Sequence, residues 1–306
     1  MRIVFMGTPD FAVASLKALL GAGENVVAVI TAPDKPAGRG QKLNKSAVKV
    51  FAEANNMPVL QPEKLRDPQF IEDLRSYNAD LQVVVAFRML PEIVWNMPPL
   101  GTINVHASLL PQYRGAAPIN HAVINGEKET GVTTFLLQHQ IDTGNILLAT
   151  KVEIADTDNA GIVHDKLMHA GAETLIKTVN GLRNKTITPI PQEDLNQEDL
   201  KHAPKIFKED CLIDWENSTE KIYNQIRGLS PYPAAFTFLN DKVLKIFETK
   251  KEIVEHNNQP GTFQSDGKTY LKFATKDGYL HLSTIQIEGK KRMEINEFLK
   301  GYRFEK

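Results

Sequence analysis

The opening stretch RIVFMGTPDFAVASLKALLGAGENVVAVIT, residues 2–31, decides the fold class. An apolar strand over 2–6 leads into a helix with an apolar face, for which Thr8 is the expected cap, and a second apolar strand follows over 25–31. A strand, a helix and a strand in this order open a doubly wound parallel sheet, so we predict a Rossmann-like α/β domain. The stretch lacks the spacing G-x-G-x-x-G, which makes a dinucleotide site a weak interpretation.

The rest of the chain continues this pattern and then changes character. A proline-rich, polar segment over 189–204 predicts a linker between a catalytic domain, residues 1–188, and a C-terminal domain, residues 205–306. Short alternating strands in the last hundred residues predict a small OB-like β-barrel. Strands are expected over 81–86, 102–105, 132–138, 146–154, 235–239, 242–248, 261–264, 270–274 and 279–286, and helices over 45–55, 68–77, 118–125, 160–182 and 219–226.

Composition narrows the class of protein. The chain has 306 residues, 42% hydrophobic and 24% charged, which is ordinary for a globular protein of two domains. A single cysteine, Cys211, excludes an internal disulfide and a zinc cluster, so we expect a cytoplasmic protein without a metal. The first residues do not resemble a secretory signal, and no run is apolar enough for a membrane span.

Polar side chains at the end of one expected strand point to a site. The run NVHASLLPQYRGAAP, residues 104–118, starts in a buried strand and breaks into a loop. Because side chains alternate along a strand, Asn104 and His106 lie on one face. A satisfied structural polar pair is one interpretation, and a ligand site beyond the carboxyl end of the strand is the other.

A third polar residue favours chemistry over structure. Asp142, in the sequence Gln140-Ile141-Asp142-Thr143-Gly144, by itself predicts a turn between two strands. Together, an Asp, a His and an Asn are what acyl transfer to an amine requires, because the amine is itself the nucleophile.

These motifs resemble the methionyl-tRNA formyltransferases, within the folate-dependent formyltransferase family, over the whole chain. The shared residues are GTPDFA at 7–12, DKPAGRG at 34–40, the run 104–118, DTG at 142–144, IDW at 213–215 and GKK at 289–291. The resemblance implies formyl transfer from 10-formyltetrahydrofolate to the amino group of methionyl initiator tRNA, with folate and tRNA as partners and a monomeric enzyme. Asn104 and His106 are then expected to stabilise the oxyanion or move a proton, and Asp142 to favour the imidazolium or accept the proton of the amine.

The resemblance also assigns the folate site to two loops. It implies binding by Ser108, Leu109, Leu110, Pro111, Phe87, Arg88, Met89 and Leu90. Many relatives read A-Y-G-L-I-L-P where this chain reads AFRMLP at 86–91, a shorter form that resembles the loop of the glycinamide-ribonucleotide relatives.

Two basic regions favour tRNA as the acceptor. The insertion over 34–45, which taken by itself predicts a mobile surface loop, carries Lys35, Arg39, Lys42 and Lys45, and the family places this loop at the acceptor end of tRNA, with Arg39 foremost. Residues 201–306 hold 18 Lys and Arg against 15 Asp and Glu, whereas residues 1–200 hold 18 against 22. Candidate contacts in the C-terminal part are Lys205, Lys208, Lys242, Lys245, Lys290, Lys291 and Arg292. Two alternatives stay open: a formyltransferase for an amino sugar nucleotide, and a non-catalytic RNA-binding protein.

Overall fold

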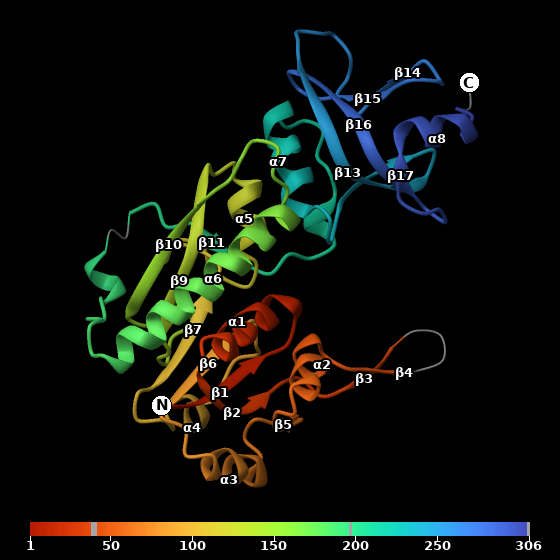
Figure 1. Cartoon of the computed structure of the whole chain (residues 1–306). Coiled ribbons are helices and arrows are strands. Elements are labelled where there is room, and N and C mark those ends of the chain that lie inside the picture. The colour runs from red at the N-terminus through yellow and green to blue at the C-terminus, as the bar shows by residue number, and fades with distance from the viewer. Residues whose placement is uncertain (38–41, 196–197, 305–306) are drawn as a thin grey trace. The chain divides into compact units, whose positions relative to one another are not determined.

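The computed structural model describes residues 1–37, 42–195 and 198–304, which form two compact units (Figure 1). Each unit takes segments from several parts of the chain. The sheet unit comprises Met1–Gly115, Glu129–Glu153 and His164–His202, and the C-terminal unit comprises Ala116–Lys128, Ile154–Val163 and Ala203–Lys306. A division of the chain at residues 188 and 205 stays a prediction.

A seven-stranded sheet organises the sheet unit, in the order β10-β9-β7-β6-β1-β2-β5. The strands β5, β2, β1, β6 and β7 run parallel, while β9 and β10 add an antiparallel edge beside β7. The chain fills one side of β1 first and then the other, as a doubly wound fold requires. The strands are β1 (Arg2–Gly7), β2 (Asn25–Ile30), β5 (Val59–Leu60), β6 (Leu81–Val85), β7 (Thr102–His106), β9 (Glu129–Leu136) and β10 (Ile146–Glu153).

Helices cover both faces of this sheet because the parallel strands are apolar on both sides. On one face, Val4 and Met6 of β1 pack against α3 and α4 through Phe70, Leu74 and Val94. Helix α6 packs on β9 and β10, where threonine hydroxyls pair at 2.8 Å (Thr134–Thr178) and 2.7 Å (Thr150–Thr174). The helices of the sheet unit are α1 (Asp10–Gly21), α2 (Ala47–Ala54), α3 (Pro68–Ser76), α4 (Glu92–Trp95) and most of α6 (Ala160–Arg183), whereas α5 (Pro118–Ile124) belongs to the C-terminal unit.

The expected strands and long helices are confirmed, with two kinds of difference. Thr8 is not the cap of α1: Pro9 occupies that position and gives no side-chain hydrogen bond, so the prediction was wrong. Several short elements were not predicted, among them α4, the 3-10 turns η1 (Gln192–Asp194) and η2 (Glu209–Cys211), and the pair β8 (Arg114–Gly115) and β11 (His202–Ala203).

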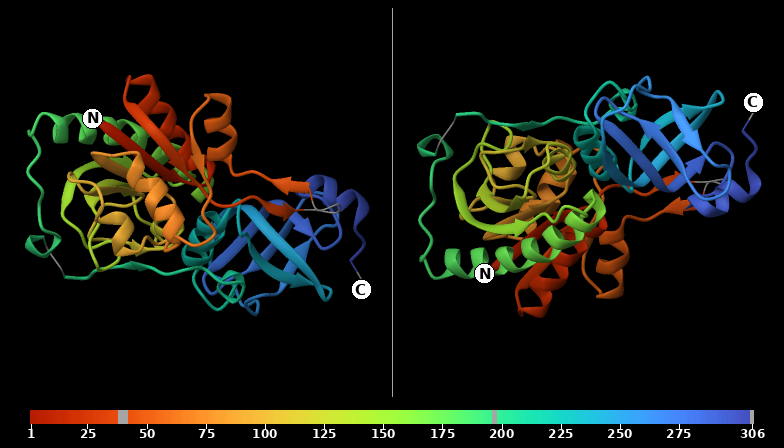
Figure 2. Two further views of the ribbon diagram at one scale, coloured as in Figure 1. Left: turned by 90° about the horizontal axis from the view of Figure 1, so that it is seen from below. Right: turned by 90° about the horizontal axis from the view of Figure 1, so that it is seen from above.

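The basic insertion contains a two-stranded hairpin, β3 (Lys35–Ala37) with β4 (Lys42–Asn44), which extends away from the sheet (Figure 2). Its base is held by polar contacts. Lys49 of α2 donates to Asp34 and to Gln61, each at 2.6 Å, and Gln61 donates to Asp34 at 2.7 Å. The hydrogen bond from Lys49, followed by that from Gln61, lowers the pKa of Asp34. The ends of this insertion are therefore built into the sheet unit.

The C-terminal unit is a curled antiparallel sheet that forms a half-barrel, in the order β12-β13-β16-β15-β14 with β17 beside β16 (Figures 1 and 2). Its core includes Trp215 stacked on Phe273, with ring centroids 4.7 Å apart. Helix α5 packs on α7, where Asn120 donates to the carbonyl of Gly228 at 2.8 Å. The elements are α7 (Thr219–Leu229), β12 (Ala235–Leu239), β13 (Lys242–Ile253), β14 (Phe263–Ser265), β15 (Leu271–Ala274), β16 (Gly278–Ile287), β17 (Met293–Glu294) and α8 (Ile295–Gly301).

Gly144 offers a test of packing in the loop between β9 and β10. A Cβ placed on Gly144 lies 1.6 Å from the carbonyl oxygen of Leu136, which belongs to the backbone of β9. We therefore expect Gly144→Ala to lower the free energy of unfolding by about 1–3 kcal/mol, as overpacking does. Urea unfolding followed by tryptophan fluorescence measures the change, with Trp95 reporting on this unit and Trp215 on the other.

Gly21→Ala is the matched control, because a Cβ there meets nothing within 4 Å. The control is expected to hold the free energy of unfolding constant or raise it by up to about 1 kcal/mol. Equal stability of the two variants contradicts the tight packing at Gly144.

Candidate functional site

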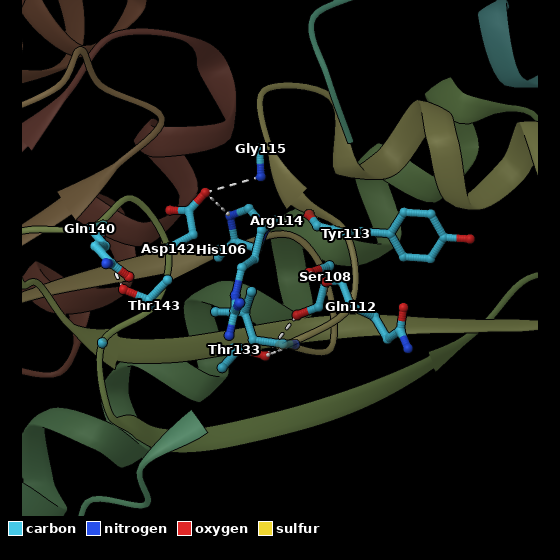
Figure 3. A network of polar contacts seen from close by, with 12 residues as sticks. His106, Ser108, Gln112, Tyr113, Arg114, Gly115, Thr133, Gln140, Asp142 and Thr143 are labelled. Atoms are coloured by element: carbon cyan, nitrogen blue, oxygen red, sulfur yellow. Dashed lines mark hydrogen bonds and ion pairs between the residues drawn. The ribbon is translucent and has the colours of Figure 1, made fainter. Parts of the chain in front are cut away.

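His106 ends β7 with its ring buried and oriented by the backbone. Its Nε2 lies 3.0 Å from the carbonyl oxygen of Tyr113, in the loop that follows the strand (Figure 3). A carbonyl oxygen only accepts, so Nε2 is the nitrogen that carries a proton in this contact. The ring also meets Phe135 of β9 edge-on, with centroids 6.4 Å apart. The other nitrogen, Nδ1, is therefore the one presented for chemistry.

Asp142 faces that nitrogen across a short gap. Its Oδ2 lies 4.0 Å from Nδ1 of His106, which is longer than a hydrogen bond. The same oxygen accepts from the backbone N–H of Gly115 at 3.1 Å (Figure 3). Asp142 holds a φ of 54°, a left-handed conformation that is uncommon for a residue other than glycine. Asp142 thus stands beside His106 while its own backbone is strained, and Tyr113, not Asp142, orients the imidazole.

Asn104 lies two residues before His106 on β7, so the two side chains share a face. Asn104 is partly buried, and among the described residues its side-chain amide has no hydrogen-bond partner. An amide without a protein partner is available to donate to a bound ligand. The predicted trio is therefore assembled from one strand and one loop, with a free donor next to the His–Asp pair.

The loop from Ser108 to Pro111 is clamped onto β9. The Oγ1 of Thr133 donates to the carbonyl of Ser108 at 2.7 Å and accepts from the N–H of Leu110 at 3.1 Å. Ser108 itself donates to the carbonyl of Gln112 at 2.6 Å (Figure 3). Leu109 fits where Gly131 has no side chain, since a Cβ there lies 2.4 Å from Leu109 Cδ2. The conformation of this loop is thus set by its neighbour strand.

The second predicted folate loop borders a cavity of about 500 Å³ within the sheet unit. Three of its four residues, Arg88, Met89 and Leu90, line this cavity, whereas Phe87 packs against the apolar core below α3 and α4. The guanidinium of Arg88 donates to the carbonyls of Pro62 and Glu63, the latter at 2.8 Å. Burial lowers the pKa of Arg88. Other lining residues are Leu65, Arg66, Pro91, Glu92, Trp95 and His139.

The predicted tRNA-binding residues Lys35 and Lys45 differ, since the first is exposed and the second is engaged in a hydrogen bond. Lys35 is exposed on β3, and Lys42 belongs to β4. Lys45 donates to Glu53 at 2.7 Å, a hydrogen bond that raises the pKa of Lys45. Arg39, the residue on which the prediction depends most, lies outside the described residues.

Basic side chains of the C-terminal unit divide in the same way. Lys242, Lys290 and Lys291 are exposed. Arg292 lies over the ring of Phe247, 4.3 Å from its centroid, and its Nη2 is 3.5 Å from Glu248. Lys205 lies over the ring of Phe207 at 5.2 Å. The exposed lysines are the better candidates for phosphate contacts.

Some residues of the site have no signal in the sequence. Thr133 has the pattern of an ordinary strand residue. Gln192 lies in the proline-rich segment after α6, where no motif marks it, and it donates to the carbonyls of Asp142 and Gly144. Within residues 1–37, 42–195 and 198–304, no three His, Cys, Asp or Glu side chains are grouped so as to hold a metal ion. In the same part of the chain, no helix is both long and apolar enough to cross a membrane.

Comparison with known proteins identifies the family of this chain. Residues 1–179 match the family model described as formyl transferase, and residues 205–303 match formyl transferase, C-terminal domain. A curated relative from Bacteroides thetaiotaomicron named methionyl-tRNA formyltransferase is 56% identical over 309 residues, which cover 99% of this chain and 96% of that protein.

Two solved structures share the fold at lower identity. An N-formyltransferase from Helicobacter canadensis in complex with folinic acid and dTDP-3-aminofucose has a TM-score of 0.67 at 21% identity, over 92% of this chain and 98% of its own. HypX from Aquifex aeolicus in complex with tetrahydrofolic acid has a TM-score of 0.66 at 19% identity, and the match spans 98% of this chain but 48% of HypX. The family models and the close curated relative decide the assignment: the chain belongs to the formyl transferase family, among its methionyl-tRNA formyltransferases.

Proposed function

We propose that this enzyme transfers the formyl group of 10-formyltetrahydrofolate to the α-amino group of methionyl initiator tRNA, as a monomer in the cytoplasm. The observation that carries the proposal is the His106–Asp142 pair, 4.0 Å apart at the end of β7, beside the free amide of Asn104. An imidazole beside a carboxylate, together with an amide donor on the same strand face as the imidazole, supplies the groups that acyl transfer to an amine needs.

The reaction forms a bond between the amine nitrogen and the formyl carbon and breaks the bond between that carbon and the folate nitrogen. Negative charge develops on the formyl oxygen on the way. The amide of Asn104 donates to this oxygen at any pH. Because Nε2 of His106 is held by Tyr113, Nδ1 faces the reacting atoms and moves the proton that the amine loses toward the folate nitrogen.

The carboxylate of Asp142 attracts the same proton, because it is negatively charged and lies beside His106. Its carboxylate is 88% buried, which strengthens its electrostatic effect on a neighbouring proton. The 4.0 Å gap to Nδ1 leaves the carboxylate free to accept from the incoming amine, either directly or through a water molecule. The hydrogen bond from Gly115 uses one lone pair of the carboxylate, and the other lone pairs can accept the proton of the amine.

The cavity beside Arg88, Met89 and Leu90 suits the ring system of the folate. It is lined by the apolar residues Leu65, Leu90 and Trp95 and by the polar residues Arg66, Glu92 and His139, a mixture typical of small-molecule sites. Arg88 is anchored on the carbonyls of Pro62 and Glu63, so it shapes the loop instead of occupying the cavity. Ser108 to Pro111 then form the edge of the folate site nearer to His106.

The acceptor is the point at which the alternatives separate. An amino sugar nucleotide needs neither the hairpin β3–β4 nor the exposed lysines of the C-terminal unit. The N-formyltransferase from Helicobacter canadensis in complex with folinic acid and dTDP-3-aminofucose is similar at only 21% identity. A non-catalytic RNA-binding protein leaves the trio on β7 without a role. Methionyl-tRNA is favoured because a relative at 56% identity carries that substrate in its name.

An acceptor panel tests this choice. With 10-formyltetrahydrofolate as donor, we expect formylation of initiator Met-tRNA to exceed that of elongator Met-tRNA and of an amino sugar nucleotide, measured by transfer of radiolabelled formyl. The KM for tRNA is expected to rise several-fold between about 50 and 200 mM salt, since lysine contacts to phosphates release counterions. Preference for the sugar, or a KM independent of salt, refutes the assignment.

Substitutions in the trio test the chemistry. We expect Asn104→Ala to lower kcat about 10²–10³-fold, the usual loss when one donor to a developing oxyanion is removed. His106→Ala removes the group that moves the proton, and we expect it to lower kcat about 10²–10⁴-fold. Asp142→Asn keeps the shape and removes the charge, and is expected to lower kcat while the protein stays folded. Steady-state kinetics with initiator Met-tRNA measures all three.

His121→Ala is the matched control. Its Nε2 lies 3.0 Å from the carbonyl of Pro204, the same kind of contact that His106 makes. Activity close to that of the unmodified enzyme is expected for this variant. A loss at His121 as large as that at His106 argues against a special role for His106.

A further inference from the structure

Gln192 is a buried side chain that joins two parts of the site. It lies in the 3-10 turn η1 after the long helix α6, with 2% of its surface exposed. Its Nε2 donates to the carbonyl of Asp142 at 3.0 Å and to the carbonyl of Gly144 at 2.8 Å. Its Oε1 accepts from Nε and Nη2 of Arg114 at 3.0 and 2.6 Å. These contacts use both protons and both lone pairs of the amide.

Arg114 determines which way the amide points. A guanidinium only donates, so the oxygen of Gln192 must face Arg114 and the nitrogen must face the loop. Arg114 lies in the same segment as Gly115, the residue whose N–H binds the Asp142 carboxylate (Figure 3). One amide therefore connects the loop that carries Asp142 with the strand segment that holds its side chain.

The backbone conformation of this loop requires contacts that hold it in place. Asp142 has a φ of 54°, a conformation that costs free energy unless neighbouring contacts maintain it. Two residues later, Gly144 packs so closely on Leu136 that no Cβ fits. Gln192 binds the carbonyls on both sides of Thr143, so it secures the strained residue and the packed glycine together.

We propose that Gln192 is a positioning residue for formyl transfer, which acts by holding the backbone of Asp142 through its Nε2. This inference rests on the proposed function, because it assigns to Gln192 the placement of Asp142 opposite His106. The segment after α6, which the sequence suggests is a plain linker, thereby contributes to the catalytic centre.

The first test removes the two donors. Gln192→Leu has a similar volume and no polar atom, and Gln192→Glu keeps an oxygen for Arg114 while it loses the donor to both carbonyls. We expect each variant to lower kcat about 10²-fold, the cost of a misplacement near 1 Å, with KM for Met-tRNA and for 10-formyltetrahydrofolate within about twofold of the unmodified enzyme. Full activity of Gln192→Glu overturns the proposal. This outcome decides the test even if Gln192→Leu does not fold.

Gln225→Leu is the matched control, because Gln225 also donates its amide to two backbone carbonyls, those of Asp210 and Leu212, both at 3.2 Å. Its kcat is expected to match that of the unmodified enzyme. An equal loss of kcat at Gln225 shows that such a clamp acts through general stability, and it overturns the proposal.

A double-mutant cycle separates positioning from stability. If Gln192 acts through Asp142, then Gln192→Leu costs little further activity in an Asp142→Asn background, because the group that it places no longer works. Additive losses overturn the proposal. Turnover of the unmodified enzyme is measured first: its absence with Met-tRNA refutes the proposed function, whereas normal turnover with an active Gln192→Glu refutes this inference alone.

Discussion

The antiparallel register between β7 and β9, in which His106 lies opposite Thr133, is the constraint on which the site depends. This pairing brings the hydroxyl of Thr133 to the backbone of the loop that follows His106, and it places Phe135 against the imidazole. A shift of one residue would reverse the face of every side chain on β7. Asn104 and His106 share a useful face because this register is maintained.

Two glycines, one in β9 and one in the loop after it, allow the loops of the site to pack closely on β9. Gly131 leaves space for Leu109, and Gly144 lets the backbone of the Asp142 loop touch β9. Both positions exclude a side chain for reasons of packing, since neither has a positive φ. Two sets of contacts thus hold the strained Asp142: the packing of its loop on β9 and the hydrogen bond from Gln192 to its carbonyl. Strain at such a residue is tolerated where the surroundings over-determine it, which is common at functional sites.

Much of this arrangement follows from local sequence patterns. Alternation along 102–106 is enough to place Asn104 beside His106, and the apolar runs predict the sheet strands because both of their faces are buried. The catalytic role of Asp142 could be predicted only with the help of the resemblance to the family, since an Asp-Thr-Gly sequence alone predicts only a turn. Gln192 could not be foreseen, because its partners Arg114 and Asp142 are 78 and 50 residues away and no periodicity encodes such contacts. The short hairpin β3–β4 escaped for a similar reason: its base depends on Asp34, Lys49 and Gln61, which meet only in the folded chain.

The interleaving of the two units has a consequence for biosynthesis. Helix α5 belongs to the C-terminal unit, and its Asn120 bonds to Gly228, 108 residues further along the chain. During translation the chain emerges from its N-terminal end, so α5 leaves the ribosome long before α7 exists to cover it. Strands of the sheet unit can pair meanwhile, but α5 stays without its partner until residues 219–229 have been made. Completion of the C-terminal unit therefore waits until α7 has been synthesised.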